Sequence, residues 1–141
     1  MRTPKILLRI AAILMLIHSV GHTIGQSGWT KTTDPVQQEV IRQMTGPKFM
    51  FMGVQRSMGN YFDGYGNALT ISLLVFLISL WLVSGELAAN PLAKKLSLFL
   101  SIALLAWAAD EFIYIFPFAA CTTLLAAICT FAGWLVAVCA K

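Results

Sequence analysis

The chain has 141 residues, of which 58% are hydrophobic and 11% are charged, and its formal net charge is +4. Soluble domains carry about 25% charged residues, and a soluble chain of this length could not bury so much apolar surface in one core. The composition therefore excludes an ordinary soluble domain and predicts a single membrane domain over residues 1–141. The basic residues are spread over loops and ends, which disfavours a nucleic-acid surface and favours contacts with lipid headgroups.

The first apolar run, residues 6–25, predicts a transmembrane helix, because about 20 helical residues cross the hydrocarbon core of a bilayer. A basic start followed by an apolar core is also typical of a signal peptide. The apolar run continues through Gly25, however, and no A-x-A-like site closes it, so we expect a retained helix. His18 and His22 are one helical turn apart on this helix and therefore share a face.

The connection that follows, residues 26–66, is too long for a structureless loop, and we expect a partly helical cap. Asp34 is typical of an N-cap and Pro35 of a first helical position, which together predict a short helix from Pro35 to Met44. The stretch after it, residues 49–67, is rich in Met, Gly and aromatic residues. It is too apolar for a solvated loop, so we expect it to lie on the bundle or dip into the membrane interface.

Three further apolar runs predict transmembrane helices at residues 67–84, 96–116 and 118–140. Runs this long must be helical in lipid, because the bilayer offers no hydrogen-bond partners to the backbone. The last two meet at Phe116–Pro117, so they are expected to be antiparallel neighbours. The predicted fold class is thus all-α, an integral membrane four-helix bundle.

Basic residues flanking the helices predict the orientation, because short cytoplasmic segments are enriched in Lys and Arg. One side carries Arg2, Lys5, Arg9, Lys94, Lys95 and Lys141, and the other carries Lys31, Arg42, Lys48 and Arg56. We therefore expect both ends of the bundle to be cytoplasmic (N-in/C-in) and the cap to face outward. A multi-pass protein of a bacterial inner membrane fits this pattern.

Five ionisable residues fall at similar depth in these predicted helices. Counted from the basic residues before each helix, His18 and His22 lie roughly 14–20 Å into the bilayer, and Asp110 and Glu111 lie about 22–24 Å in. Asp63 stands just before the second helix, at the outer boundary. Ionisable residues inside a membrane usually face the bundle interior and mark function. These five are therefore the predicted site, in the outward half of the bilayer.

Asp110 and Glu111 diverge by about 100° around their helix, so we expect only one of them to face the histidines. The aromatic neighbours Trp107 and Tyr114 favour Glu111 as the active carboxylate and Asp110 as a structural group. The predicted substrate-contacting residues are Trp107, Tyr114, Tyr61, Tyr65, Asn67 and Arg56.

The favoured function is a membrane enzyme that performs acid–base chemistry, as an isomerase, cyclase or hydrolase, on a lipid-soluble small molecule. A histidine and a carboxylate in a low-dielectric pocket provide a proton donor and acceptor. No GxSxG motif is present, which disfavours covalent catalysis. The structural alternative is that the histidines only pack, that Asp63 caps the second helix, and that Arg56 neutralises Asp63 or Glu111.

A second hypothesis is a divalent metal site, although no cofactor is required by the first. His18 and His22 have the spacing of two ligands on one helix, and Glu111, Asp110 or Asp63 could complete the set. The segment HSVGH lacks the glutamate of the HExxH motif. The cysteines at 121, 129 and 139 have no metal-binding spacing and are expected to pack in lipid.

A third hypothesis is a proton-coupled small transporter or an accessory subunit, in which the carboxylates carry protons. Four helices are few for such a transporter, so this function needs a homo-oligomer. The predicted partners are the lipid bilayer and a lipid-like small-molecule ligand, and nucleic acid is not expected.

Overall fold

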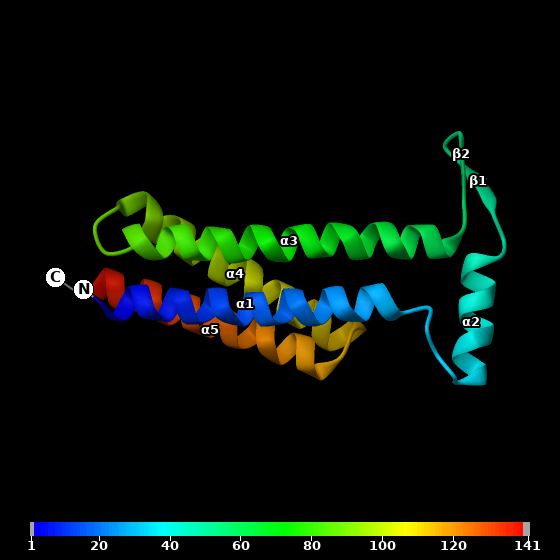
Figure 1. The fold of residues 1–141 in the computed structure, drawn as a ribbon. Helices are drawn as coiled ribbons and strands as arrows, with labels where there is room; N and C mark the ends of the chain where they lie inside the picture. Colours follow the sequence, from blue (N-terminus) through cyan, green and yellow to red (C-terminus); the bar gives the residue numbers. More distant parts are fainter. Residues whose placement is uncertain (1, 140–141) are drawn as a thin grey trace. The chain divides into compact units, whose positions relative to one another are not determined.

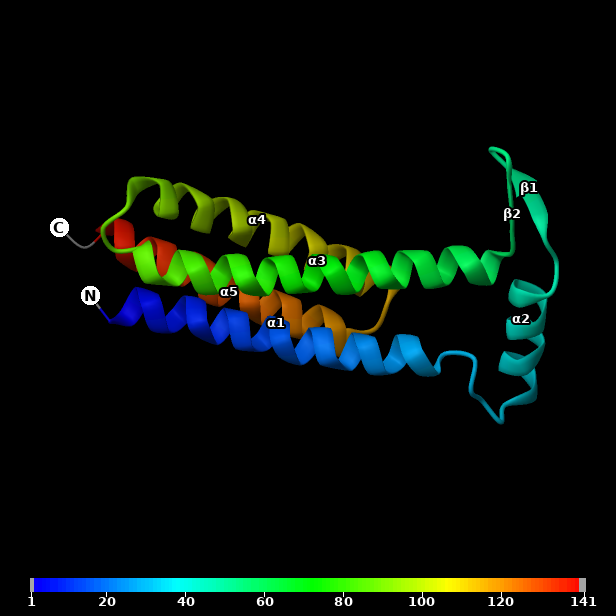
Figure 2. The same ribbon diagram turned by 45° about the horizontal axis from the view of Figure 1, so that its top comes forward.

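The computed structural model describes residues 2–139, which contain five helices and one β-hairpin (Figure 1 and Figure 2). Four of these helices are long and apolar enough to cross a membrane, so the chain is an all-α, multi-pass membrane protein apart from the hairpin. The elements are α1 (Thr3–Gly28), α2 (Pro35–Thr45), β1 (Phe49–Phe51), β2 (Val54–Arg56), α3 (Met58–Glu86), α4 (Pro91–Tyr114) and α5 (Pro117–Cys139).

The described residues form two compact units. The first, called here the bundle unit, contains the residues up to Ser19 and those from Leu73 onward, and so the first part of α1, the last part of α3, α4 and α5. The second, called the hairpin unit, is Val20–Ser72 and contains the end of α1, α2, the hairpin and the start of α3.

In the bundle unit, α4 and α5 form an antiparallel pair joined by Ile115 and Phe116 (Figure 2). The sequence predicted this pairing from the shortness of the connection. Small buried side chains let the two helices approach closely. The buried residues of α5 are Ala119, Ala120, Thr122, Thr123, Ala126, Ala127, Thr130, Gly133 and Ala137.

α1 packs against α5 at Gly133. A Cβ atom at this position would lie 2.5 Å from the Leu8 Cδ1 and 3.3 Å from the Pro4 carbonyl oxygen, so a side chain here would force Leu8 to move and crowd the start of α1. Leu8 continues into a buried cluster with Leu87 and Ala137. The bundle unit is therefore held by apolar contacts at this end.

α3 begins at Met58, nine residues before the predicted start at 67, so the predicted cap region of 26–66 was too long. The Ser57 N–H donates to the Asn60 Oδ1 at 3.1 Å, and the Asn60 N–H donates to the Ser57 Oγ at 3.2 Å. These reciprocal bonds form a capping box in which asparagine replaces the usual Glu or Gln. The glycines of residues 58–66 obscured this signal in the sequence, because glycine is a poor helix former.

α4 also begins earlier than predicted, at Pro91 rather than residue 96. Pro91 is the first helical residue, where a missing N–H costs nothing. Asn90 is the N-cap, and its Oδ1 accepts a hydrogen bond from the Leu92 N–H at 2.9 Å.

In the hairpin unit, α2 confirms the short helix predicted for Pro35–Met44, with one more residue at its end. The Asp34 side chain caps it by accepting hydrogen bonds from the N–H groups of Val36 and Gln37, at 2.8 and 3.0 Å.

The β-hairpin of residues 49–56 was not predicted. Its strands are antiparallel, and Met52 and Gly53 form the turn with φ angles of 49° and 82°. Positive φ at both turn positions is what a two-residue hairpin requires, and glycine adopts it without strain. The rings of Phe49 and Phe51 pack on the Tyr61 ring of α3, with centroids 5.9 and 6.4 Å apart.

Candidate functional site

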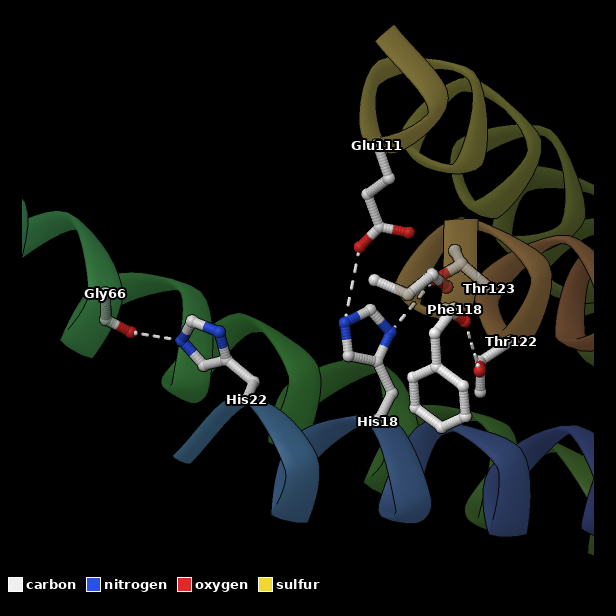
Figure 3. A network of polar contacts seen from close by, with 8 residues as sticks. His18, His22, Gly66, Glu111, Phe118, Thr122 and Thr123 are labelled. Atoms are coloured by element: carbon white, nitrogen blue, oxygen red, sulfur yellow. Dashed lines mark hydrogen bonds and ion pairs between the residues drawn. The ribbon is translucent and has the colours of Figure 1, made fainter. Parts of the chain in front are cut away.

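His18 stands at a point where three helices of the bundle unit meet (Figure 3). Its Nε2 atom lies 3.3 Å from the Glu111 Oε1 of α4, and its Nδ1 atom lies 3.0 Å from the Thr123 Oγ1 of α5. The exposed fractions of His18 and Glu111 are only 5% and 2%, and Thr123 is fully buried. One imidazole ring therefore joins α1, α4 and α5 in a water-poor environment.

The hydrogen-bond network assigns the protons of this ring. The Thr123 hydroxyl donates to the Ala119 carbonyl at 3.2 Å, because a carbonyl oxygen can only accept. Since the hydroxyl has one proton, its oxygen is left to accept a hydrogen bond from the His18 Nδ1–H. The Nε2 atom then faces Glu111, and one proton lies between the ring nitrogen and the carboxyl oxygen.

This pair can hold a proton in two ways without a net charge. Either Glu111 is protonated and donates to a neutral His18, or an imidazolium faces a carboxylate. A lone charge in lipid costs several kcal/mol, so the shared proton is what makes the pair tolerable there. One proton more makes the pair a buried cation, and one proton fewer makes it a buried anion.

The helix faces explain why these side chains meet. His18 continues the buried stripe of α1 formed by Leu8, Ala11 and Met15, at spacings of three and four residues. Glu111 continues the buried stripe of α4, whose other members are Ala93, Ser97, Ser101, Leu104 and Ala108. Asp110 lies outside this stripe and is exposed.

The two aromatic candidates of α4 differ in their surroundings. The Trp107 ring is half-buried and contacts the Phe76 ring edge-on, with centroids 5.3 Å apart. Tyr114 is exposed at the end of the helix. Trp107 therefore serves the packing of α3 on α4 within the bundle unit.

His22 belongs to the hairpin unit and has a different partner. Its Nε2–H donates to the Gly66 carbonyl of α3 at 3.0 Å (Figure 3). The Thr70 hydroxyl donates to the same carbonyl at 3.1 Å. The proton on His22 is thus on Nε2, whereas the network of His18 places a proton on Nδ1.

Asp63 lies inside α3 rather than before it, so the prediction that it caps this helix is wrong. Its Oδ1 atom accepts hydrogen bonds from the Trp29 Nε1 at 2.7 Å and from the Gln26 Nε2 at 3.3 Å. Within residues 2–139 no Lys or Arg forms an ion pair with Asp63, so Arg56 does not neutralise it.

Two open cavities lie in the hairpin unit. One, of about 340 Å³, is lined by Arg56, Asn60, Tyr61, Gly64, Tyr65 and Ala68. The other, of about 510 Å³, is lined by Thr23, Gln26, Ser27, Trp29, Thr30, Asp63, Asn67 and Thr70. Five residues predicted from the sequence line these cavities, namely Arg56, Tyr61, Tyr65, Asp63 and Asn67. Gln26, Ser27 and Trp29 were not predicted, because they fall in the region expected to be a cap.

Metal binding finds little support in the described part of the chain. Among residues 2–139, no three His, Cys, Asp or Glu side chains are grouped so that they could hold a metal ion. The cysteines at 121, 129 and 139 are free thiols. The convergence of all five predicted residues in one pocket stays a prediction.

Compared with protein-family models, curated proteins and solved structures, the chain matches none. The fold and the site together define a multi-pass helical membrane protein with a buried histidine–carboxylate pair.

Proposed function

We propose that this protein is a membrane enzyme that performs acid–base chemistry on a lipid-soluble small molecule, with the His18–Glu111 pair as its proton donor and acceptor. The observation that carries the proposal is the 3.3 Å contact between two buried groups that can each hold a proton. Thr123 supports it as a positioning residue, because its hydroxyl fixes the ring orientation and the tautomer.

The reaction class follows from the surroundings of the pair. An isomerisation removes a proton from one atom of the substrate and returns it to another, and it needs no second reactant. Hydrolysis would need water, which is scarce among buried side chains. A cyclisation that begins when a double bond of the substrate is protonated also needs no water, so it fits the same buried surroundings. We therefore favour isomerisation or cyclisation over hydrolysis.

Substrate access follows from the burial. A lipid-soluble substrate would reach His18 laterally from the bilayer, as α1 and α4 separate locally. The His18 Nε2 would then accept the substrate proton, and protonated Glu111 would return one. The predicted aromatic contacts of Trp107 and Tyr114 belong to the same proposal.

The orientation is part of this proposal. In the bundle unit, the start of α1 and the connection between α3 and α4 lie at the same end (Figure 1). Lys5, Arg9, Lys94 and Lys95 are therefore gathered there, which favours a cytoplasmic location for this end. The hairpin between α1 and α3 would then face outward, in a bacterial inner membrane.

The test compares lipid extracts of cells that express the wild type, Glu111→Gln, His18→Gln or Glu86→Gln. Glu86 is exposed in the bundle unit, so Glu86→Gln makes the same chemical change away from the pair. Removal of a general acid or base typically lowers the rate ~100-fold or more. We expect a lipid-soluble product with the wild type and Glu86→Gln, and its loss with the other two. A product that persists in Glu111→Gln would contradict the proposal.

A second candidate, proton-coupled transport or an accessory role in it, is favoured by one observation. The pair links α1 to α4, so a change in its protonation changes the attraction between these two helices. Proteoliposomes with an internal pH-sensitive dye separate the two functions. Proton flux that Glu111→Gln abolishes favours transport, possible only for an oligomer of this small chain, and absence of flux favours the enzyme.

A further inference from the structure

The 510 Å³ cavity of the hairpin unit is a built polar pocket that the His18–Glu111 chemistry does not use. Cavities of roughly 300–1,000 Å³ are of the size that holds small molecules. Two helix faces form its walls. The face of α1 and the turn after it supplies Thr23, Gln26, Ser27, Trp29 and Thr30, and the face of α3 supplies Asp63, Asn67 and Thr70.

Asp63 is the only charged residue that lines this pocket in the described part of the chain. The Trp29 indole and the Gln26 amide hold its Oδ1 atom, and both are neutral donors. These neutral donors orient the carboxylate, but they bring no positive charge to balance it. An anionic ligand is disfavoured there, because it would bring a second negative charge beside an unbalanced one.

The other side chains that line the pocket offer hydrogen-bond acceptors, which suit a ligand group with several N–H donors. Hydroxyl groups of Thr23, Ser27, Thr30 and Thr70 and the amide oxygen of Asn67 can all accept hydrogen bonds. A primary ammonium group has three N–H donors and no acceptor. It would place one bond on Asp63, where hydrogen bonds to a charged group are strongest, and the others on these neutral oxygens.

Gly66 allows this arrangement. A side chain at this position would overlap the Gln26 amide, so glycine lets Gln26 pass over α3 and reach Asp63. The backbone of Gly66 is itself fixed, because its carbonyl accepts hydrogen bonds from His22 and Thr70.

We propose that this pocket binds the ammonium group of a small amine through Asp63. The amine is either a free water-soluble molecule or the ethanolamine headgroup of a lipid, since both carry the same group. The proposal stands apart from the acid–base chemistry at His18, because it concerns the hairpin unit alone.

The experiment follows Trp29 by ¹⁹F NMR of the full chain labelled with 5-fluorotryptophan, in phosphatidylglycerol nanodiscs. The chain has four tryptophans, and the Trp29 signal is identified by its loss in Trp29→Phe. Ethanolamine is titrated, with ethylene glycol as the neutral probe of similar size. We expect a saturable shift of the Trp29 signal with ethanolamine and none with ethylene glycol.

Two variants test the role of Asp63. Asp63→Asn should weaken ethanolamine binding about tenfold, since it removes a charged hydrogen-bond acceptor. Asn67→Lys places an ammonium one helical turn after Asp63, keeps the Trp29 bond intact, and should also block the probe. Glu39→Gln is the matched control, because Glu39 is an exposed carboxylate that does not line the pocket.

A further arm separates the two sources of the ammonium group. In nanodiscs that contain phosphatidylethanolamine, a headgroup ligand shifts the Trp29 signal before any probe is added, and this shift is absent in Asp63→Asn. A free amine gives the shift only on titration. An unmoved Trp29 signal in both arms, equal shifts with ethylene glycol, or unchanged affinity in Asp63→Asn would each overturn the proposal.

Discussion

At the scale of single residues, His18 is held at both ring nitrogens by side chains from other helices, Glu111 and Thr123, which fixes the orientation of the ring. The contact with Thr123 can be removed with little change in packing, because valine has almost the same shape as threonine. Its removal leaves the proton-sharing contact with Glu111 in place and tests positioning alone.

Thr123→Val should leave the His18 Nδ1–H buried without its acceptor and destabilise the protein by about 1–3 kcal/mol. Thr130→Val is the matched control, because the Thr130 hydroxyl is equally buried on α5 but donates only to the Ala126 carbonyl of its own helix. Unfolding in mixed micelles measures both. Equal losses of stability in the two variants would contradict the role of Thr123 as the hydrogen-bond acceptor of His18.

A second ionisable pair, Glu39 with Arg42 on α2, makes the folding stability depend on pH. The two hydrogen bonds from the Arg42 guanidinium lower the pKa of Glu39 to about 2, and the Gln43 amide adds to this effect. The folded pKa is below the unfolded value of about 4.5, so the stability from this pair is present above the unfolded value. It is lost as the pH falls through about 2.

NMR titration of the Glu39 carboxyl carbon checks this expectation. In Arg42→Gln the midpoint should rise toward the ordinary value, because both guanidinium bonds and the positive charge are gone. Both side chains are exposed to solvent, so the gain in stability is small and screened by salt. An unchanged midpoint in Arg42→Gln would show that the pair does not persist in solution.

At the scale of helices, the effect of replacing a glycine on stability depends on how closely the neighbouring helix approaches it. Gly133→Ala should destabilise the bundle unit by about 1 kcal/mol, because the new methyl group meets Leu8 and the Pro4 carbonyl. Gly85→Ala should be neutral or stabilise by up to about 1 kcal/mol, because nothing lies within 4 Å of the added atom. Unfolding of the two variants checks the difference, and the opposite order would contradict the packing of α1 on α5.

The elements also show how far the sequence predicts the fold. Run length and hydropathy predict the four long helices, because a backbone in lipid must form its hydrogen bonds internally. Asp34 with Pro35 predicts α2. The start of α3 was missed because its capping box uses Asn60 among glycines. The hairpin was missed because each of its strands has only three residues, too few to show a period of two.

Within the site, the structure brings Glu111 rather than Asp110 beside His18, and the role of Glu111 as the active carboxylate stays a prediction. The aromatic neighbours suggested it, whereas the buried stripe of α4 is what turns Glu111 toward His18. The role of Thr123 could not be predicted, since a threonine in an apolar helix gives no signal until its neighbours are known.

At the scale of the whole molecule, the proposed orientation places the connection between α3 and α4 in the cytoplasm. Single cysteines at Thr32 and Lys94, in a chain whose native cysteines are replaced by alanine, test it with a membrane-impermeant maleimide. Thr32→Cys should be labelled from outside intact cells, and Lys94→Cys only after permeabilisation. The reverse pattern would invert the topology and place the hairpin unit in the cytoplasm.

The shared proton between His18 and Glu111 is tested most directly by ¹⁵N NMR of histidine-labelled protein in nanodiscs. The network predicts opposite tautomers, with a proton on Nδ1 of His18 and on Nε2 of His22. Glu111→Gln should shift the His18 Nε2 signal and leave His22 unchanged, while Glu86→Gln should move neither. A His18 Nε2 signal that is the same in the wild type and in Glu111→Gln would contradict the proton-sharing pair.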